Sequence, residues 1–177
     1  MAAVTIRRAD DEDVSDVLAI LAEATAWLRT KGIVQWPDRF PRSVIEATVD
    51  SGGLFVATEG SVIVATVTLL WSDPSFWGDR DDAGFVHRLV VRRTHVGLGR
   101  TVLDWAADQV GSAGRSHLCL DCLGTNERLR RFYEELGFRL VGEVPGPADH
   151  PHSAAHGSWT AALYEKAISS KCDTGSE

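Results

Sequence analysis

The sequence predicts an α/β protein in which strands and helices share one domain. Residues 85–91 are largely apolar and β-branched, as in a buried strand, and the chain then passes through Gly97 and Gly99 into a stretch with apolar residues at helical spacing. A second apolar strand, at 118–122, leads into a second helical stretch at 127–136. Two strand-then-helix units of this kind are typical of a sheet with helices packed against it.

The first part of the chain adds a strand, two helices and a loop. Residues 4–8 have the composition of a strand, and acidic residues at 10–13 favour the start of a helix. Apolar residues continue at helical spacing to Leu28, and Gly32 ends the helix. A proline-bounded loop and a short helix then follow, at 33–41 and 43–49.

A hairpin precedes the first unit, and one more pair of strands follows the second. Glu59, Gly60 and Ser61 split two apolar runs, which predicts the hairpin. Its strands are expected at 54–58 and 62–70, and the later strands at 138–144 and 158–167. The polar connections are predicted as loops at 75–83 and 145–157.

Length and composition limit the class of protein. The 177 residues fit a single domain over 1–177, with 169–177 as a flexible tail. A formal net charge of −7 gives no support to a nucleic-acid partner. The sequence has no run of about twenty apolar residues and no signal peptide, so neither a membrane span nor export is expected. Three cysteines, read as reduced thiols, fit a cytoplasmic protein.

The basic glycine turn after residues 85–91 suits a phosphate or pyrophosphate, because free backbone amides and a helix start meet there. A Walker loop needs a glycine at position 94 and a lysine after the second glycine, and the chain has Thr94 and Arg100 instead. A dinucleotide fingerprint needs a small residue where Val102 stands, and it expects an earlier place in the chain.

Both strand-then-helix units resemble the GNAT family of N-acetyltransferases. The family's pattern Gln/Arg-x-x-Gly-x-Gly/Ala after a buried strand is matched at Gly97 and Gly99, whereas Thr94 replaces its first residue. Neighbouring Arg92 and Arg93 are available to supply the missing charge. The family's second pattern, a strand, an asparagine and a helix ending in Tyr-x-x-x-Gly-Phe, is matched by the residues that follow the second strand: Asn126, Phe132, Tyr133, Gly137 and Phe138.

The resemblance, which covers about residues 50–145, implies a fold and a cofactor. The fold would be a mixed, mostly antiparallel twisted sheet, flanked by helices and splayed at a cofactor cleft between the central strand and the next one. The cofactor would be acetyl-CoA, with coenzyme A as the product. The residues expected to bind it are Leu89, Val90, Val91, Arg92, Arg93, Val96, Gly97, Leu98, Gly99, Arg100, Thr101 and Asn126.

The resemblance also implies catalytic roles. Tyr133 matches the family's acid that protonates the sulfur of coenzyme A, and a phenol with a pKa of about 10 is close to an alkyl thiol. His87 lies where the family often places a base, although a strand histidine can equally be a hydrogen-bonded core residue. Asp73 is another candidate base. The loop histidines His150, His152 and His156 are further candidates, and no metal is expected.

The acceptor is expected to be a small-molecule amine. Trp36, Asp73 and Trp77 are candidate substrate residues, although Trp36 could instead simply pack on the sheet. With the acidic segment 79–82, the tryptophans hint at a small aromatic or cationic amine. The resemblance also allows a homodimer, which no sequence feature specifies.

Three other functions stay open. A peptide or protein amine could be the acceptor. A non-catalytic acyl-CoA-binding or regulatory module would keep the glycine turn and dispense with Tyr133. A nucleotide-binding domain would prefer ATP or NAD to coenzyme A.

Overall fold

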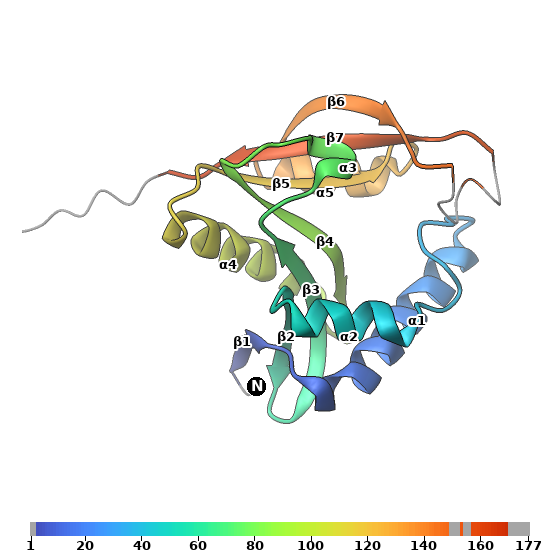
Figure 1. Ribbon diagram of the computed structural model, residues 1–177. Coiled ribbons are helices and arrows are strands. Elements are labelled where there is room, and N and C mark those ends of the chain that lie inside the picture. The colour runs from blue at the N-terminus through green and yellow to red at the C-terminus, as the bar shows by residue number, and fades with distance from the viewer. Residues whose placement is uncertain (1–2, 149–152, 154–156, 170–177) are drawn as a thin grey trace, which may run out of the picture.

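The computed structural model describes residues 3–148, 153 and 157–169. Seven strands of the described residues form one sheet in the order β1-β2-β3-β4-β5-β7-β6 (Figure 1). Their bounds are β1 Val4–Arg8, β2 Leu54–Glu59, β3 Val62–Leu70, β4 Ala83–Val91, β5 His117–Leu123, β6 Arg139–Pro145 and β7 Thr160–Ala167. Neighbouring strands are antiparallel except β4 and β5, which are parallel. The mixed, mostly antiparallel sheet expected from the sequence is therefore confirmed.

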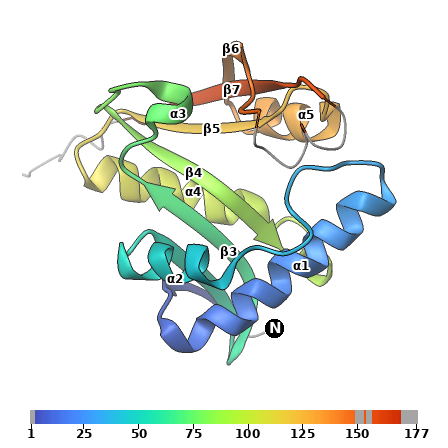
Figure 2. The ribbon, with the colours of Figure 1, turned by 45° about the vertical axis from the view of Figure 1, so that its right-hand side comes forward.

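Helices cover both faces of this sheet, as Figures 1 and 2 show. Their bounds are α1 Val14–Thr30, α2 Arg42–Asp50, α3 Pro74–Trp77, α4 Leu98–Ser112 and α5 Glu127–Glu135. The apolar stripe of α1 and Ile45 of α2 pack with Val56 and Ile63 in one buried cluster. Because successive side chains of a strand alternate between the faces of a sheet, the neighbours of these strand residues point to the opposite side.

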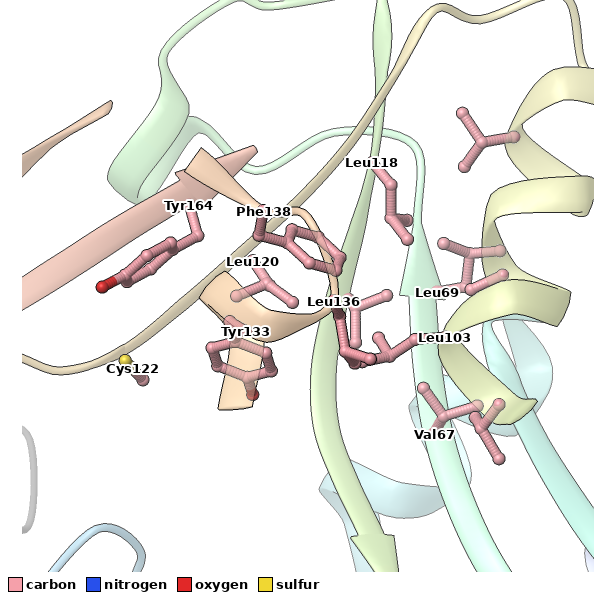
Figure 3. Close-up of a cluster of buried hydrophobic side chains, with 14 of the residues drawn as sticks. Val67, Leu69, Leu103, Leu118, Leu120, Cys122, Tyr133, Leu136, Phe138 and Tyr164 are labelled. Carbon is pink, nitrogen blue, oxygen red and sulfur yellow. The ribbon is translucent and has the colours of Figure 1, made fainter. Parts of the chain in front are cut away.

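A larger cluster lies on that opposite side, under α4 and α5. Figure 3 shows how side chains from both helices and from the strands meet there. Its members include Val67, Leu69, Leu103, Leu118, Leu120, Cys122, Tyr133, Leu136, Phe138 and Tyr164. Since α4 and α5 each follow a strand of the parallel pair, this core fixes both strand-then-helix units relative to each other.

The sheet parts between β4 and β5. These strands pair only from Ala83–His117 to Val86–Leu120. Beyond that point β4 remains paired with β3 up to Val91, and β5 remains paired with β7 up to Leu123. The two strands therefore diverge while each keeps its outer partner, which can be followed in Figure 2. The splay expected from the family resemblance is confirmed.

A β-bulge lies just past the parting point in β4. Thr68 pairs with His87 and Thr66 pairs with Val90, so Arg88 and Leu89 together oppose a single residue of β3. Arg88 has φ +48, the only positive φ among the described non-glycine residues. A left-handed residue of this kind costs about 1–3 kcal/mol and is found most often at functional sites.

Some expected elements were wrong in detail. The loop predicted at 75–83 contains the short helix α3, which begins with Pro74 at a position where the missing amide hydrogen is tolerated. The first helix starts with a separate 3-10 turn at Asp11–Asp13, capped by the Asp10 side chain. In the predicted tail, Ser169 follows β7 without regular structure, and residues 170–177 lie outside the described residues.

No helix among the described residues is long and apolar enough to cross a membrane.

Candidate active site

A cavity of about 450 Å³ lies beside the gap between β4 and β5. Its walls come from the loop after α1, from α3, from both parted strands, from the glycine turn and from α5. The lining includes Gln35, Trp36, Phe76, His87, Arg88, Arg93, Val96, Gly97, Gly99, Asp121, Cys122, Tyr133 and Trp159. A second cavity of about 530 Å³ lies between α1 and α5 and shares Leu89, Val91, Arg92 and Arg93 with the first. The two cavities are therefore neighbours, and the end of β4 lines both of them.

The glycine turn supplies backbone donors to the first cavity. Gly97 precedes α4 with φ +96, a conformation that glycine adopts without strain. The first amides of a helix have no partner within the helix, and the macrodipole adds partial positive charge there. A Cβ on Gly99 would lie 3.4 Å from Cζ of Phe132, so the first turn of α4 is in van der Waals range of α5.

The arginines near this turn have different environments. Arg92 donates from Nε to the carbonyl of Ile63 at 2.8 Å and from Nη1 to Glu23 at 2.8 Å. It therefore ties the end of β4 to β3 and α1. The exposed Arg93 lies over the ring of Trp27, 5.5 Å from its centroid, and lines both cavities. Arg93 is thus better placed than Arg92 to meet a phosphate.

Other predicted cofactor residues lie around the two cavities. Leu89, Val90 and Val91 belong to the part of β4 that has no β5 partner. Leu98, Arg100 and Thr101 are in the first turns of α4, where the Arg100 amide donates to the carbonyl of Gly97 at 3.2 Å. Within the described chain, neither cavity includes the side chains of these three α4 residues, so their contribution would come from the backbone.

Asn126 caps α5 and also lines the second cavity. Its side-chain oxygen accepts a hydrogen bond from the Leu129 amide at 3.2 Å, which satisfies one unpaired donor of the helix start. This bond fixes the oxygen and orients the side-chain amide group. The nitrogen remains a donor for a ligand in the groove.

Tyr133 lines the first cavity from α5 with only 7% of its surface exposed. Its ring packs against Phe132, Phe138 and Tyr164. Burial, followed by the nearby Cys122 and Asp121, raises the pKa of Tyr133 above its ordinary value. The phenol therefore keeps its proton at neutral pH and is available as a hydrogen-bond donor to a ligand in the cavity.

His87 lies between two carboxylates. Its Nε2 is 3.4 Å from Oδ2 of Asp73, which precedes α3, and its Nδ1 is 3.7 Å from Oδ1 of Asp121 on β5. The first pair is close but is not aligned as a hydrogen bond, and neither atom has another partner within the described residues. Because β4 and β5 part after Val86 and Leu120, His87 and Asp121 are the first residues beyond the pairing.

Burial governs the charge of this cluster. It raises the pKa of Asp121 to about 6, and Asp73 adds to the shift while His87 opposes it. Asp121 therefore changes charge close to neutral pH. A carboxyl with a pKa raised in this way can exchange a proton with a bound ligand at little cost.

A metal ion is the other ligand that these residues could hold. One ligand atom from each of Asp73, His87 and Asp121 lies within 4.8 Å of the others. The closest contact of each carboxylate, however, is with a different ring nitrogen, and this arrangement suits an imidazole that takes up a proton between two carboxylates. The loop histidines His150, His152 and His156 lie outside the described residues.

The three predicted substrate residues lie in different surroundings. Trp36 lines both cavities and packs edge-on against Phe40, with ring centroids 6.0 Å apart. Asp73 contacts His87. Trp77 is not part of either lining and packs on Phe85 instead, whereas its neighbour Phe76 lines the first cavity.

The acidic segment 79–82 also lies outside both linings. Asp82 pairs with Arg80 and His117. Of the residues that hinted at an aromatic or cationic amine in the sequence, Trp36 therefore lines the cavity, whereas Trp77 and the acidic segment do not.

Sequence reasoning missed Asp121, Arg88 and Phe76. The one available signal for Asp121 was a carboxylate within the apolar run Leu118–Leu123. Arg88 gave no signal, because its bulge depends on the pairing with β3. Cys122 lines the cavity, and burial raises the pKa of its thiol to about 12, so it is protonated at neutral pH and unsuited to act as a nucleophile.

Comparisons with known proteins agree with this geometry. Residues 21–138 match the family described as Acetyltransferase (GNAT) family. The uncharacterized N-acetyltransferase YesJ of Bacillus subtilis is 29% identical over 143 residues, which cover 74% of this chain and 79% of that protein.

Solved structures show the same fold. A GNAT family acetyltransferase from Listeria monocytogenes has a TM-score of 0.74 at 22% identity, and the match covers 94% of this chain and 96% of that one. The acetyltransferase yncA of Salmonella typhimurium, solved with acetyl-CoA, has a TM-score of 0.69 at 20% identity and 95% coverage of both chains.

Proposed function

The chain belongs to the acetyltransferase (GNAT) family, and we propose that it transfers the acetyl group of acetyl-CoA to a primary amine of a small molecule. The observation that carries this proposal is the parting of β4 and β5 with Tyr133, His87 and Asp121 around the gap. A donor, a proton acceptor and unpaired strand amides then surround one cavity, as transfer from a thioester to an amine requires.

The glycine turn would hold the pyrophosphate of coenzyme A. The left-handed Gly97 has no atom within 4 Å of the position of a Cβ, so an anion can approach the backbone there. Amides at the start of α4 would donate to it, and Arg93 would add positive charge. The pantetheine arm would bind along β4 at Leu89, Val90 and Val91, through those of their backbone groups that point away from β3, and Asn126 would donate from its side-chain nitrogen.

Bound acetyl-CoA supplies the activated acetyl group, and the protein moves the protons. His87 would accept a proton from the amine as the new bond forms, and the carboxylates of Asp73 and Asp121 would stabilise the resulting imidazolium. Tyr133 would give its phenolic proton to the departing sulfur. Direct transfer within a ternary complex requires no covalent enzyme intermediate.

Size and shape of the cavity favour a small acceptor. The part of the cavity lined by Trp36, Phe76 and Trp159 would be the acceptor end, and the whole cavity measures about 450 Å³. Cavities of this size bury most of a small ligand.

An acceptor screen tests the proposed function. Purified protein is incubated with acetyl-CoA and single amines, and the release of free thiol is measured. We expect turnover with small amines and none with lysine-containing peptides. Turnover only with peptides would replace the small-molecule assignment, and acetyl-CoA binding without any turnover would favour the non-catalytic module.

A variant tests the assigned base. His87→Ala should lower kcat and remove the limb of the pH–rate profile that reports the base. A profile that overlays that of the wild type would exclude His87. A chelator such as EDTA should leave the wild-type rate unchanged, because the proposed mechanism uses no metal ion.

A further inference from the structure

Arg88 lines the cavity as a cation that has no acidic partner among the described residues. Its Nη2 donates to Oγ1 of Thr48 on α2 at 3.3 Å. Its Nε is buried and has no hydrogen-bond partner within the described part of the chain, and Arg88 is in no ion pair there. Nearby Arg92 and Arg80, in contrast, both pair with carboxylates. Burial lowers the pKa of Arg88, yet a guanidinium stays charged at neutral pH.

The β4 bulge explains how Arg88 reaches the cavity. In a regular strand, consecutive side chains point to opposite faces. Here His87 contacts Asp73 before α3 while Arg88 contacts Thr48 on α2, so two consecutive side chains serve the same face. The left-handed backbone of Arg88 accompanies this arrangement. The chain thus places a cation beside the proposed base by adopting an unfavourable backbone conformation.

A partly buried charge without an ion-pair partner is less favourable than a paired one, and an anionic ligand would supply the missing partner. The remaining donors of Arg88 could form hydrogen bonds to an oxyanion, and guanidinium and carboxylate groups fit each other in a forked geometry. The rest of the acceptor end is aromatic, with Trp36, Phe76 and Trp159 in the lining. The carboxylates of Asp73 and Asp121 contact His87 and would favour an ammonium group there.

We propose that the acceptor is a free amino acid with an apolar or aromatic side chain, and this proposal rests on the proposed function. Its carboxylate pairs with Arg88, its amine faces His87 and Asp121, and its side chain packs among the cavity aromatics. Polyamines and aminoglycosides fit less well, because they would bring further positive charge towards Arg88. This assignment replaces the expectation of a cationic amine.

Matched acceptors test this proposal. Phenylalanine, tryptophan and methionine are each compared with the amine that lacks the carboxylate and with the methyl ester. We expect kcat/KM to be at least about tenfold higher for one or more of the free amino acids, because only they offer an anion to Arg88. Equal values for acid, amine and ester would overturn the proposal, and so would the absence of both binding and turnover with all three amino acids.

Variants of Arg88 give a second readout. Arg88→Met should lower kcat/KM for the amino acid by about 10²-fold, mainly through KM, and leave the value for the matched amine nearly unchanged. Arg88→Lys keeps the positive charge but loses the two-pronged guanidinium geometry, so its kcat/KM for the amino acid should lie between those of the wild type and Arg88→Met. Arg42→Gln, on the same helix as Thr48 but in an exposed ion pair with Glu46, is the control and should behave as wild type. An equal loss for acid and amine in Arg88→Met would contradict the proposal.

The affinity for acetyl-CoA distinguishes a failure of the proposed acetyltransferase function from a failure of the amino-acid acceptor alone. Titration calorimetry of acetyl-CoA should give the same Kd for the wild type, Arg88→Lys and Arg88→Met. A wild-type protein that does not bind acetyl-CoA would refute the proposed function itself. A protein that binds it but shows weakened binding in Arg88→Met would indicate that Arg88 serves the cofactor, which overturns the amino-acid acceptor alone.

Discussion

Asp121 shows at the scale of one residue how the site departs from an ordinary core. It lies on β5 between Leu120 and Cys122, both of them buried. A carboxylate there is desolvated, and its partner His87 is at 3.7 Å, too far for a hydrogen bond. The protein therefore keeps an ionisable group where an apolar one would be more stable.

Asp121→Asn should stabilise the fold at neutral pH while it lowers activity. The folded-state pKa of about 6 exceeds the unfolded value, so the native state binds this proton more tightly, and its stability falls as pH rises through that range. A shift of two units corresponds to about 3 kcal/mol at most. We expect the free energy of unfolding of the variant to exceed that of the wild type by part of this amount at pH 7.5 and to equal it at pH 4. Urea unfolding at both pH values measures the difference.

The exposed Asp16 on α1 provides the control for this measurement. Asp16→Asn should alter the free energy of unfolding by less than about 0.5 kcal/mol at either pH. Identical pH dependence of stability in Asp121→Asn and the wild type would show that Asp121 does not titrate in this way.

Tyr133→Phe should reduce kcat by about 10²-fold or more, because a general acid contributes on this order. The ring contacts with Phe138 and Tyr164 are kept, so stability and the Kd of acetyl-CoA should change little. The measurement is steady-state kinetics combined with titration of acetyl-CoA.

Tyr164→Phe is the matched control, because its hydroxyl donates to Glu134 and does not line the cavity. It should leave kcat unchanged. A Tyr133→Phe enzyme with a wild-type rate would remove Tyr133 from the mechanism.

At the scale of one element, α4 contributes both to the core of the fold and to the proposed cofactor site. Its buried face, with Val102, Leu103, Ala106 and Val110, belongs to the larger core cluster. The start of α4 faces the cavity, because Gly97 and Gly99 belong to the cavity lining. The packing of this helix thus fixes the position of the proposed pyrophosphate site.

Gly97→Ala should weaken acetyl-CoA binding about five- to tenfold, because alanine disfavours the left-handed backbone that opens the first turn, at a cost of about 1 kcal/mol. Calorimetric titration checks the affinity.

Gly114→Ala, just beyond the end of α4, is a matched control. Both glycines have positive φ and nothing within 4 Å of a built Cβ. The control should lose a similar amount of stability and keep the wild-type Kd. Equal affinities in the two variants would argue against a phosphate site at Gly97.

At the scale of the whole molecule, the parted sheet leaves its two halves joined by few hydrogen bonds. Only four residue pairs connect β4 to β5, against seven between β5 and β7. The shared core under α4 and α5 holds the halves together, and a ligand in the gap would add contacts to both.

Acetyl-CoA should therefore raise the apparent stability by about 2.7 kcal/mol at a hundredfold excess over Kd, or roughly 5–10 °C in Tm for a chain of this size. Thermal shift with acetyl-CoA, coenzyme A, ATP and NAD measures this. We expect ATP and NAD to give smaller shifts. A larger shift with either nucleotide would favour the nucleotide-binding alternative.

The strand-then-helix units, the glycine turn and the Tyr133 helix could be predicted from the sequence, because each depends on periodicity or on neighbouring residues. Cofactor residues of the glycine turn are close in the sequence, so local patterns were enough to propose them. The family resemblance added the parted sheet, which pairing along the chain alone does not reveal.

Only the tertiary structure decided what surrounds His87. Asp73 reaches it from the residue before α3 and Asp121 from β5, and the register between β3 and β4 creates the bulge that turns Arg88 to the same face. The sequence determined the elements because their patterns repeat over a few residues. Strand register and the meeting of distant side chains depend instead on the packing of the whole sheet, and they place the charges of the site.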